Sequence, residues 1–562
     1  MRNPRTKNTS IALARLLTFR AAVLACMILI AFSGATLHAQ FIYVDVYDFI
    51  DLDCPSGCVP IDLGQLTRWS DGNFYGSTFQ GAGSNLGGTL FSFNPSNGTV
   101  NLAWQFTDNS TGFEPYAGLS LGSDGNFYGT TAQTNTTSTS VFRFTPPSTL
   151  TAIHNFIPPE GPAVTAPTQA RDGNFYGVVG QATYRITYPG GVYQPLPGTI
   201  PLSGSYSPTP LVAALDGNLY ATQWTYPNNG TIFRLTTAGK VKVVHTFDGA
   251  HGAVPTGLTL GADGNLYGTT FDGGANGTGV IFKFTLPSHK LTVLHSFSSL
   301  PGSGQNLDGA EPTNGLLAAS DGYLYGATSL GGNNGCGTLF RISTSGSFTK
   351  LAEFPNFDCV DGGSLMPIAT LTENTDGTLY GLLEQGTGEG NLYALVPSVP
   401  VHTIIYAGPI WVKPGVPVQI LGDNLGEAVS VTFGGIEGTF QLGSNSYLTA
   451  IAPDNAVDGP IVVTLTNPAG EEQVQSQQNM HILPVINNLD PARGSPGSQV
   501  DIAGGGFLGA TKVTFGGIKA SSFTVTTPGL IQATVPAGAK TGKITVTTPN
   551  GKVTSTQKFV VD

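Results

Sequence analysis

One motif recurs seven times in the first four hundred residues: an Asp-Gly pair followed by Tyr four residues after the Asp. The copies begin at Asp71, Asp124, Asp172, Asp216, Asp263, Asp321 and Asp376, at spacings of 53, 48, 44, 47, 58 and 55 residues. A mean spacing of about 51 residues is longer than helical-pair repeats and suits a four-stranded propeller blade.

The rest of each repeat supplies four short strands. An apolar-alternating run precedes Asp-Gly, which predicts a tight hairpin turn because Gly accepts positive φ and Asp tolerates it. The next strand carries the Tyr, followed by Gly in six copies, with Ala221 as the exception. A third strand carries an aromatic residue and a fourth ends in Phe, as in VKVVHTF and LTVLHSF. This period-2 pattern predicts half-buried antiparallel sheet.

The two ends of the repeat region complement each other. The seventh repeat has three strands but no fourth, whereas residues 42–49, IYVDVYDF, match the fourth-strand pattern without three strands before them. Closing the ring with this strand removes the open sheet edges. We therefore predict an all-β chain in which residues 41–397 form a seven-bladed β-propeller closed by the N-terminal strand 42–49.

A different pattern follows residue 400 and occurs twice. VKPGVPVQILGDNLGEAVSVTFGG and DPARGSPGSQVDIAGGGFLGATKVTFGG place Phe433 and Phe515 82 residues apart, and each copy continues with A-x-x-P and alternating strands. About 80 residues with seven short strands suit an immunoglobulin-like sandwich. The expected domains are residues 401–483 and 484–562.

These motifs carry two resemblances. The G-x-x-V-x-I-x-G, V-T-F-G-G and A-x-x-P elements of both C-terminal copies resemble the IPT/TIG domain family. DGNLYGTT, GTLF or GTIF, and the fourth-strand HTF and HSF resemble secreted bacterial tandem-repeat proteins of the GloVer-repeat, choice-of-anchor type. The resemblance implies extracytoplasmic adhesion, scaffolding or recognition.

Residues 1–39 are predicted to be a secretion signal. Five basic residues and no acid accompany an apolar run of twelve residues, 21–32, which is too short to span a bilayer. Cleavage is expected after Ala39, with Ala35 as the alternative, and no membrane-spanning segment is expected in the mature chain. The remaining 19 basic and 35 acidic residues give a net charge of −16. This acidity disfavours nucleic acid as a partner.

Four cysteines remain after the signal: Cys54, Cys58, Cys336 and Cys359. An even number in an exported chain predicts two disulfides, whereas zinc would require more closely paired thiols with His nearby. Cys336 falls in a loop between strands two and three, and Cys359 in a connection between blades, at the same end of the sheets. Of three possible connectivities, we expect Cys54–Cys58 and Cys336–Cys359.

Most candidate catalytic or metal-binding residues have a structural explanation. His154, His245 and His295 occupy one position in three separate fourth strands, which indicates a packing position rather than a catalytic cluster. The seven Asp-Gly carboxylates are spread around the ring, whereas calcium needs six to eight clustered oxygens. No GxSxG, HExxH or CxxC motif is present. We therefore expect no catalytic residue, metal or cofactor.

The best candidates for ligand binding lie between the blades. Glu114 and Glu311 each precede Pro at the start of an innermost strand, and Asp248 and His251 lie in another connection. The loops between strands two and three, rich in Gly and Asn, would lie at the same end and present backbone and amide groups. Solvated acids and flexible surface loops are the alternative interpretation.

These features favour a secreted or extracytoplasmic protein, held at the cell surface or released, that is not an enzyme. We expect recognition, adhesion or scaffolding, with the propeller face binding a polysaccharide, another carbohydrate or a surface protein. The alternatives are a propeller-based lyase or hydrolase with a site in the central channel, because fold does not fix function, and a purely structural surface protein.

Overall fold

The structure of the chain is a computed structural model. It describes residues 41–49, 65–78, 87–106, 114–115, 118–131, 139–156, 165–188, 191–200, 208–224, 229–286, 288–301, 304–354, 366–367, 369–384, 390–397, 404–406, 410–422, 425–444, 447–467, 470–476 and 478–562. These residues form strands β1 to β48 and one 3-10 turn, η3 (Leu425–Glu427), with no α-helix among them. The chain divides into two compact units, Met1–Val401 and His402–Asp562.

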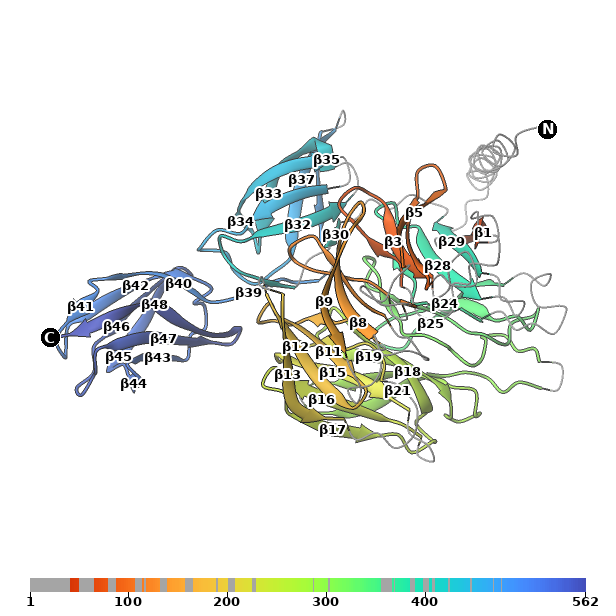
Figure 1. Cartoon of the computed structure of the whole chain (residues 1–562), viewed down its shortest axis with the longest axis horizontal. Coiled ribbons are helices and arrows are strands. Elements are labelled where there is room, and N and C mark those ends of the chain that lie inside the picture. The colour runs from red at the N-terminus through yellow and green to blue at the C-terminus, as the bar shows by residue number, and fades with distance from the viewer. Residues whose placement is uncertain are drawn as a thin grey trace. The chain divides into compact units, whose positions relative to one another are not determined.

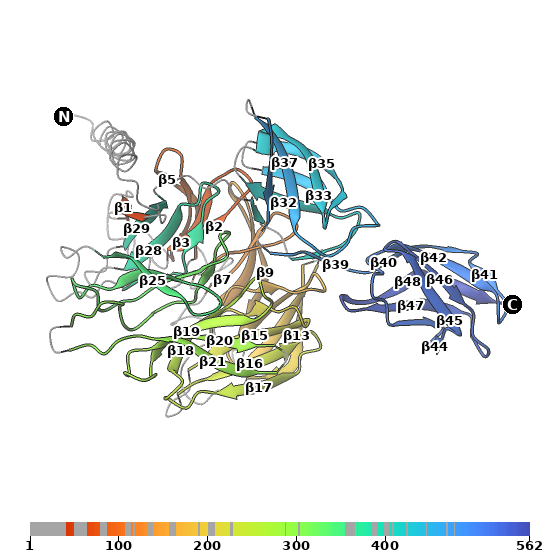
Figure 2. The same cartoon turned by 180° about the vertical axis from the view of Figure 1, so that it is seen from behind.

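The described strands of the first unit form seven antiparallel sheets, which we number in chain order (Figures 1 and 2). Sheet 1 contains β2 (Thr67–Arg68), β3 (Phe74–Thr78), β4 (Thr89–Asn94) and β5 (Thr99–Gln105); sheet 2, β6 (Ser120–Leu121), β7 (Phe127–Thr131), β8 (Thr139–Thr145) and β9 (Thr149–Phe156); sheet 3, β10 (Thr168–Gln169), β11 (Phe175–Val179), β12 (Ala182–Thr187) and β13 (Val192–Thr199).

The series continues in the same strand order. Sheet 4 contains β14 (Val212–Ala213), β15 (Asn218–Gln223), β16 (Thr231–Thr236) and β17 (Val241–Thr246); sheet 5, β18 (Ala253–Leu260), β19 (Leu266–Asp272), β20 (Val280–Thr285) and β21 (Lys290–Ser296); sheet 6, β22 (Leu317–Ala318), β23 (Leu324–Ala327), β24 (Thr338–Ile342) and β25 (Phe348–Glu353). Sheet 7 contains β26 (Met366–Pro367), β27 (Thr372–Glu373), β28 (Leu379–Glu384), β29 (Gly390–Pro397) and the N-terminal β1 (Phe41–Asp48).

Apolar clusters join each sheet to the next. Six buried clusters lie between successive sheets from 1–2 to 6–7. A further cluster packs Phe74 and Phe91 of sheet 1 against Tyr380 and Leu392 of sheet 7. The last sheet therefore packs on the first, and the series closes as a β-propeller.

Strand β1 completes the last sheet, as the repeat pattern predicts. It pairs antiparallel with β29, from Phe41 opposite Pro397 to Asp48 opposite Asn391, although the two strands are separated by most of the unit's sequence (Figure 1). Its register shifts between Asp45 and Tyr47, and a bulge of the same kind precedes Trp104 in β5 and His295 in β21. The N-terminal strand thus has the geometry of the other fourth strands.

The Asp-Gly pairs form the predicted hairpin turns. In sheet 1 the Gly72 amide donates to the Trp69 carbonyl at 3.0 Å, and Gly72 has a φ of +84°. The equivalent glycines of the other six sheets also have positive φ, between 76° and 84°. One oxygen of Asp71 accepts the Asn73 amide at 2.8 Å. The turn is therefore a three-residue loop with Gly in the left-handed region, stabilised by the Asp side chain.

The Tyr-Gly step and the third-strand aromatic residue are two parts of one contact. Gly129 lies opposite Phe142 in the β7–β8 register, and a Cβ on Gly129 would lie 2.4 Å from the tip of that ring. The same pairing occurs in all seven sheets. In sheet 4 the small residue is Ala221, opposite Phe233. Gly is used because the tip of the aromatic ring occupies the space that a Cβ would need.

The second unit contains two successive groups of sheets. The first comprises the sheet β30 (Ile404–Tyr406), β32 (Pro417–Gly422), β36 (Tyr447–Ile451), β35 (Thr439–Ser444), the sheet β34 (Ile436–Glu437), β33 (Ala428–Phe433), β37 (Ile461–Asn467), β38 (Gly470–Gln475), and the parallel pair β31 (Trp411–Val412) and β39 (His481–Ile482). Its core includes Phe433.

The second group repeats this strand order. Its sheets are β40 (Val485–Asp490), β42 (Gln499–Gly505), β46 (Leu530–Thr534), β45 (Ser522–Thr527), and β41 (Arg493–Gly494), β48 (Gly551–Val561), β47 (Gly542–Thr548), β43 (Lys512–Phe515), β44 (Ile518–Lys519). Phe515 occupies its core as Phe433 occupies the first.

Candidate functional site

Alternate connections of an antiparallel sheet lie at the same end. In the first unit, the Asp-Gly turns and the turns between strands three and four form one face, which we call the turn face. The loops between strands two and three, together with the connections between successive sheets, form the opposite loop face. The predicted ligand-binding residues Glu114, Glu311, Asp248 and His251 all lie on the loop face, in connections that lead into sheets 2, 6 and 5.

On the turn face, the repeated Asp carboxylates already accept hydrogen bonds from neighbouring residues. Asp263 accepts hydrogen bonds from the Tyr267 hydroxyl at 2.8 Å and the Lys283 ammonium at 2.7 Å. Burial alone would raise the pKa of Asp263. These hydrogen bonds and those from Asn265 outweigh burial and lower the pKa to about 2. Turn formation, rather than a calcium site, accounts for the Asp in these turns.

The basic partner in this arrangement was not predicted from the sequence. Arg143, Arg185, Arg234, Lys283 and Arg341 follow the aromatic residue of the third strand in five sheets and lie opposite the Tyr in register. Lys283 reaches Asp263, and Arg341 lies 4.0 Å from Asp321. The sequence repeats an aromatic residue followed by a basic one in these third strands. Only the strand register shows that the basic residue lies opposite the Tyr.

The repeated histidines pack between sheets. The His154 ring stacks on Tyr193 with centroids 3.7 Å apart, and the His295 ring stacks on Phe348 at 4.0 Å. Burial lowers the pKa of His245. Each His lies in a different sheet, so the described residues contain no His cluster at this position. These contacts agree with the packing role inferred from the repeat.

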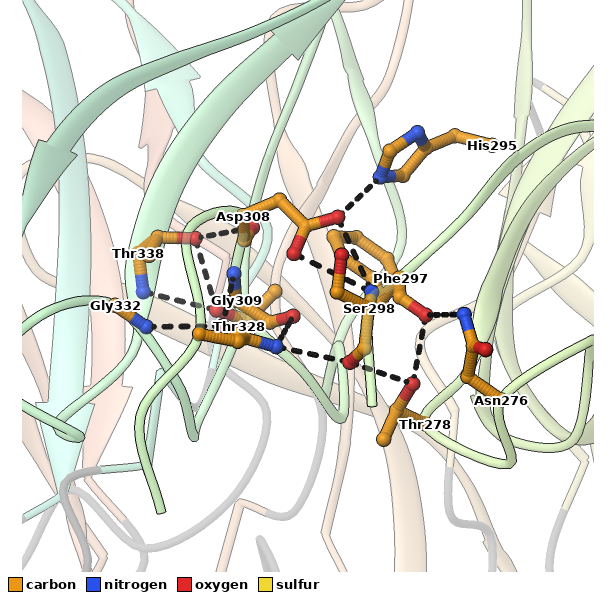
Figure 3. Close-up of polar contacts among 11 residues, drawn as sticks. Asn276, Thr278, His295, Phe297, Ser298, Asp308, Gly309, Thr328, Gly332 and Thr338 are labelled. Carbon is orange, nitrogen blue, oxygen red and sulfur yellow. Dashed lines mark hydrogen bonds and ion pairs between the residues drawn. The ribbon is translucent and has the colours of Figure 1, made fainter. Parts of the chain in front are cut away.

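A network around Asp308 organises the connection between sheets 5 and 6 (Figure 3). His295 Nε2 lies 3.0 Å from the Asp308 carboxylate, which also accepts the Ser298 amide at 3.1 Å. The Asp308 carbonyl accepts the Thr338 hydroxyl at 3.0 Å. Partial burial raises the pKa of Asp308, but the hydrogen bonds from His295 and Ser298 outweigh it, so the pKa is lowered. Asp308 thereby ties the connection between sheets 5 and 6 to both of those sheets.

The Gly-rich loops beside this connection are also held by hydrogen bonds. The Asn276 amide donates to the Phe297 carbonyl at 2.7 Å, and the Asn334 amide makes the equivalent bond to Phe354 at 3.2 Å. The Thr278 hydroxyl donates to the same Phe297 carbonyl, as Figure 3 shows. In sheets 5 and 6 these hydrogen bonds tie the loops to the ends of the neighbouring fourth strands.

Glu311 has a backbone conformation that is rare for a residue with a side chain. Its φ is +56°, and its amide donates to the Thr278 carbonyl of the preceding sheet at 3.0 Å. Burial, followed by the nearby charge of Asp272, raises the pKa of Glu311, and burial raises that of Asp272. The charge of Asp272 therefore acts on the Glu311 carboxyl on the loop face. Left-handed non-Gly residues often occur at functional sites.

Glu114 repeats this conformation in sheet 2. Its φ is +57°, and its amide donates to the Gly87 carbonyl of sheet 1 at 2.6 Å. Burial raises the pKa of Glu114, and its Oε2 atom is buried with no hydrogen-bond partner among the described residues. Val254 has the same conformation in sheet 5, with a φ of +55°. The structure does not bring Glu114 and Glu311 into contact with each other.

Asp248 and His251 do form a pair. His251 Nδ1 lies 2.7 Å from the Asp248 carboxylate, which also accepts the His251 amide at 2.8 Å. The backbone and side-chain hydrogen bonds from His251 lower the pKa of Asp248. Both side chains are more than half exposed. The pair shapes its own loop and lies open to solvent.

The innermost strands are joined by threonine hydroxyls, which sequence analysis did not anticipate. Thr67 donates to the Leu119 carbonyl of the next sheet at 2.6 Å, Thr168 to Leu211 at 2.7 Å, and Thr372 to Leu66 at 2.6 Å. All three lie four residues before the Asp of their repeat. These bonds use polar side chains near the ring centre to connect sheets.

The predicted disulfides lie largely outside the described residues. Cys336 is buried in the β23–β24 loop, whereas Cys54, Cys58 and Cys359 fall outside the described ranges, as does the signal at residues 1–39. Their pairing stays a prediction. Within the described ranges, no group of three His, Cys, Asp or Glu residues could hold a metal ion. The described part of the chain also contains no helix suited to crossing a membrane.

Several solved structures are distantly similar to this chain. A fungal alcohol oxidase of the AA5 family in complex with copper has 14% identity and a TM-score of 0.46, covering 78% of this chain and 99% of that one. A gluconolactonase from Xanthomonas campestris has 13% identity, a TM-score of 0.35 and coverages of 64% and 89%. TolB from Acinetobacter baumannii has 16% identity, a TM-score of 0.32 and coverages of 50% and 63%. At these TM-scores the similarities say nothing about activity.

Comparison with protein families finds a match in each unit. A search of curated proteins found no match. The IPT/TIG domain matches residues 484–561, which confirms the second predicted sandwich but not the first. The Gloeobacter/Verrucomicrobia repeat matches residues 53–194 and 180–396, more than half of the chain. The chain therefore belongs to the Gloeobacter/Verrucomicrobia repeat family and carries an IPT/TIG domain at residues 484–561.

Proposed function

We propose that this chain is an exported, non-enzymatic recognition protein whose loop face binds carbohydrate. In this proposal the seven sheets are the blades of a seven-bladed propeller, and residues 401–483 form a second IPT/TIG-like sandwich. Their strand order β30-β32-β36-β35 matches β40-β42-β46-β45 of the family-matched domain. The two sandwiches serve as a spacer or secondary binding module. Residues 1–39 are the export signal.

The observation that carries this proposal is a fixed polar loop surface over sheets 5 and 6. The hydrogen bonds of Asn276, Thr278, Asp308 and Asn334 hold these loops before any ligand arrives. Binding then costs little ordering entropy, which is the main advantage of a preorganised site. A loop face that had to order on binding would lose that advantage.

The chemistry of this surface suits hydroxyl-rich ligands. The neighbouring carboxyls of Glu311 and Asp272 make no ion pair within the described residues, so their oxygens can accept hydrogen bonds from hydroxyls. Gly-rich loops allow close approach of a ligand to backbone amides and carbonyls. The acidic chain disfavours phosphate-rich partners. A neutral polysaccharide can donate hydroxyl hydrogen bonds to these carboxyls and carries no phosphate.

The test uses the full mature chain on a glycan array, together with a pull-down from secreted extract. We expect binding to a glycan class, weakened at least tenfold by the double change Asp272→Asn and Glu311→Gln. The control Lys240→Gln alters an exposed residue in the β16–β17 turn, on the turn face, and should bind like the unchanged protein. The proposal fails if neither assay exceeds its control. Conversion of a bound glycan into product would instead indicate a lyase or hydrolase.

A further inference from the structure

Glu373 occupies the junction at which the last sheet packs on sheet 6. It lies on β27, is buried with 8% of its surface exposed, and reaches across to Ser320 of sheet 6. Glu373 Oε2 accepts the Ser320 amide at 2.8 Å, and its Oε1 bonds the Ser320 hydroxyl. This carboxyl plays no part in the loop face, because it lies three residues before the Asp-Gly turn.

Sheet 3 contains the same junction with a neutral side chain. Gln169 also lies three residues before its turn Asp, and it reaches Ser123 of sheet 2. Its Oε1 accepts the Ser123 amide at 2.9 Å, while its Nε2 donates to the Ser123 hydroxyl at 2.9 Å. The amide side chain therefore accepts one hydrogen bond and donates the other.

A protonated Glu373 would reproduce this pattern, because a carboxylic acid has one acceptor oxygen and one hydroxyl donor. An ionised Glu373 keeps both bonds only as an acceptor, with the Ser320 hydroxyl donating, and it then places a negative charge in a buried junction, which destabilises the contact between the sheets. We propose that Glu373 is a protonation-controlled latch of ring closure, which holds sheet 7 firmly on sheet 6 when protonated and loosens that junction when ionised.

The charges around Glu373 favour the protonated form. Burial is the largest influence, and the carboxylates of Asp321 and Asp376 add to it, while the two Ser320 bonds oppose it. Together they raise the pKa of Glu373 to about 7. Two basic groups of the adjoining sheets have other partners: Arg68 bonds Asn374, and Arg341 lies near Asp321. Among the described residues, Glu373 forms no ion pair with a cation.

The direction of the pH effect follows from linkage. The pKa of Glu373 is higher in the closed junction than its ordinary value of 4.5, so closure is firmest at low pH. Stability of the junction falls as pH rises from 4.5 towards 7 and levels off above that. Strand β1 completes sheet 7, so this latch acts on the sheet in which the first and last strands of the propeller pair.

Hydrogen exchange of the full chain between pH 5.5 and 8.5 tests the latch. The measured quantity is the exchange rate of peptides covering residues 317–325 and 369–384, divided by the rate in Glu373→Gln at the same pH, which cancels intrinsic amide chemistry. This ratio should rise roughly 30-fold over that range and flatten above pH 7. A ratio that does not change with pH over this range would overturn the proposal.

A matched variant keeps the test independent of how Glu373→Gln folds. Gln169→Glu places the same carboxyl at the junction of sheets 2 and 3, and its peptides over residues 120–131 and 168–176 should acquire a pH-dependent rate of the same sign. Infrared spectra should also show a protonated-carboxyl band that titrates near pH 7 and is missing from Glu373→Gln. Unchanged exchange at that junction, or loss of the band well below pH 6, would contradict the latch.

Discussion

The hydroxyl of Tyr128 donates a hydrogen bond of 2.9 Å to the carboxylate of Asp124, four residues earlier in the chain. The same bond occurs in six of the seven sheets, at Asp71, Asp124, Asp172, Asp216, Asp263 and Asp321. It explains why the repeat requires both residues: the Asp closes the turn with one oxygen and fixes the buried Tyr with the other. The motif is a structural unit rather than a ligand site.

Replacing Tyr128 with Phe should therefore destabilise the propeller by about 1.5–3 kcal/mol, the range for a hydrogen bond to a charged group. Urea unfolding of the full chain measures this change. Tyr380→Phe is the control, since Tyr380 lies at the equivalent position of sheet 7 but its hydroxyl makes no such bond to Asp376. Equal losses in the two variants would show that the bond is not the cause.

The Asp263–Lys283 pair predicts an acid-sensitive contribution to stability. The folded pKa of Asp263, about 2, is below its ordinary value of 3.8, so its contribution is present above pH 4 and is lost as pH falls towards 2. Because the pair is partly exposed, we expect only about 1 kcal/mol. Unfolding free energies of the unchanged protein and Asp263→Asn should converge below pH 2.5, and added salt should shrink their difference at neutral pH.

Introducing a Cβ beneath the third-strand aromatic ring should be costly. In Gly129→Ala, the new Cβ would lie 2.4 Å from the ring tip of Phe142, so overpacking should destabilise the chain by about 1–3 kcal/mol. Combining it with Phe142→Leu should cost less than the sum of the two changes, because the smaller side chain relieves the clash. Strict additivity in this double-mutant cycle would refute the proposed contact.

Mass spectrometry of an unreduced digest tests the cysteine pairing. We expect cross-linked peptides that join Cys336 to Cys359, and a short closed loop between Cys54 and Cys58. Reduction should destabilise sheet 6 more than sheet 3, because the Cys336 bond would fasten the β23–β24 loop to the following connection. Cross-links between Cys54 or Cys58 and Cys336 would require a different arrangement of these loops.

Much of the propeller could be predicted from the sequence because each repeat specifies a local turn and its side-chain contacts. Asp-Gly turns, Tyr at a fixed offset and the orphan strand at residues 42–49 predicted the sheets and the N-terminal strand that completes the last one. The side-chain contacts between neighbouring sheets could not be predicted in the same way. Thr67 and Gln169 look like ordinary strand residues in sequence, and their contacts with Leu119 and Ser123 depend on how neighbouring sheets are juxtaposed.

The candidate site was predicted by position rather than by geometry. Glu114 and Glu311 were singled out because they precede Pro at the start of innermost strands, and both indeed have left-handed backbone. Asp272 was not chosen, since its sequence context, the end of β19, resembles the start of any Gly-rich loop. Its proximity to Glu311 follows from packing between successive sheets. Likewise, Asp308 gives no sign in sequence of its bond to His295.

The most direct test of the proposed recognition role is the affinity of the full mature chain for the glycan class identified on the array, measured by calorimetry. The account predicts that Asp272→Asn with Glu311→Gln weakens binding at least tenfold, or about 1.4 kcal/mol, whereas Lys240→Gln on the turn face leaves it unchanged. Equal affinity of all three proteins would contradict a binding site on the loop face.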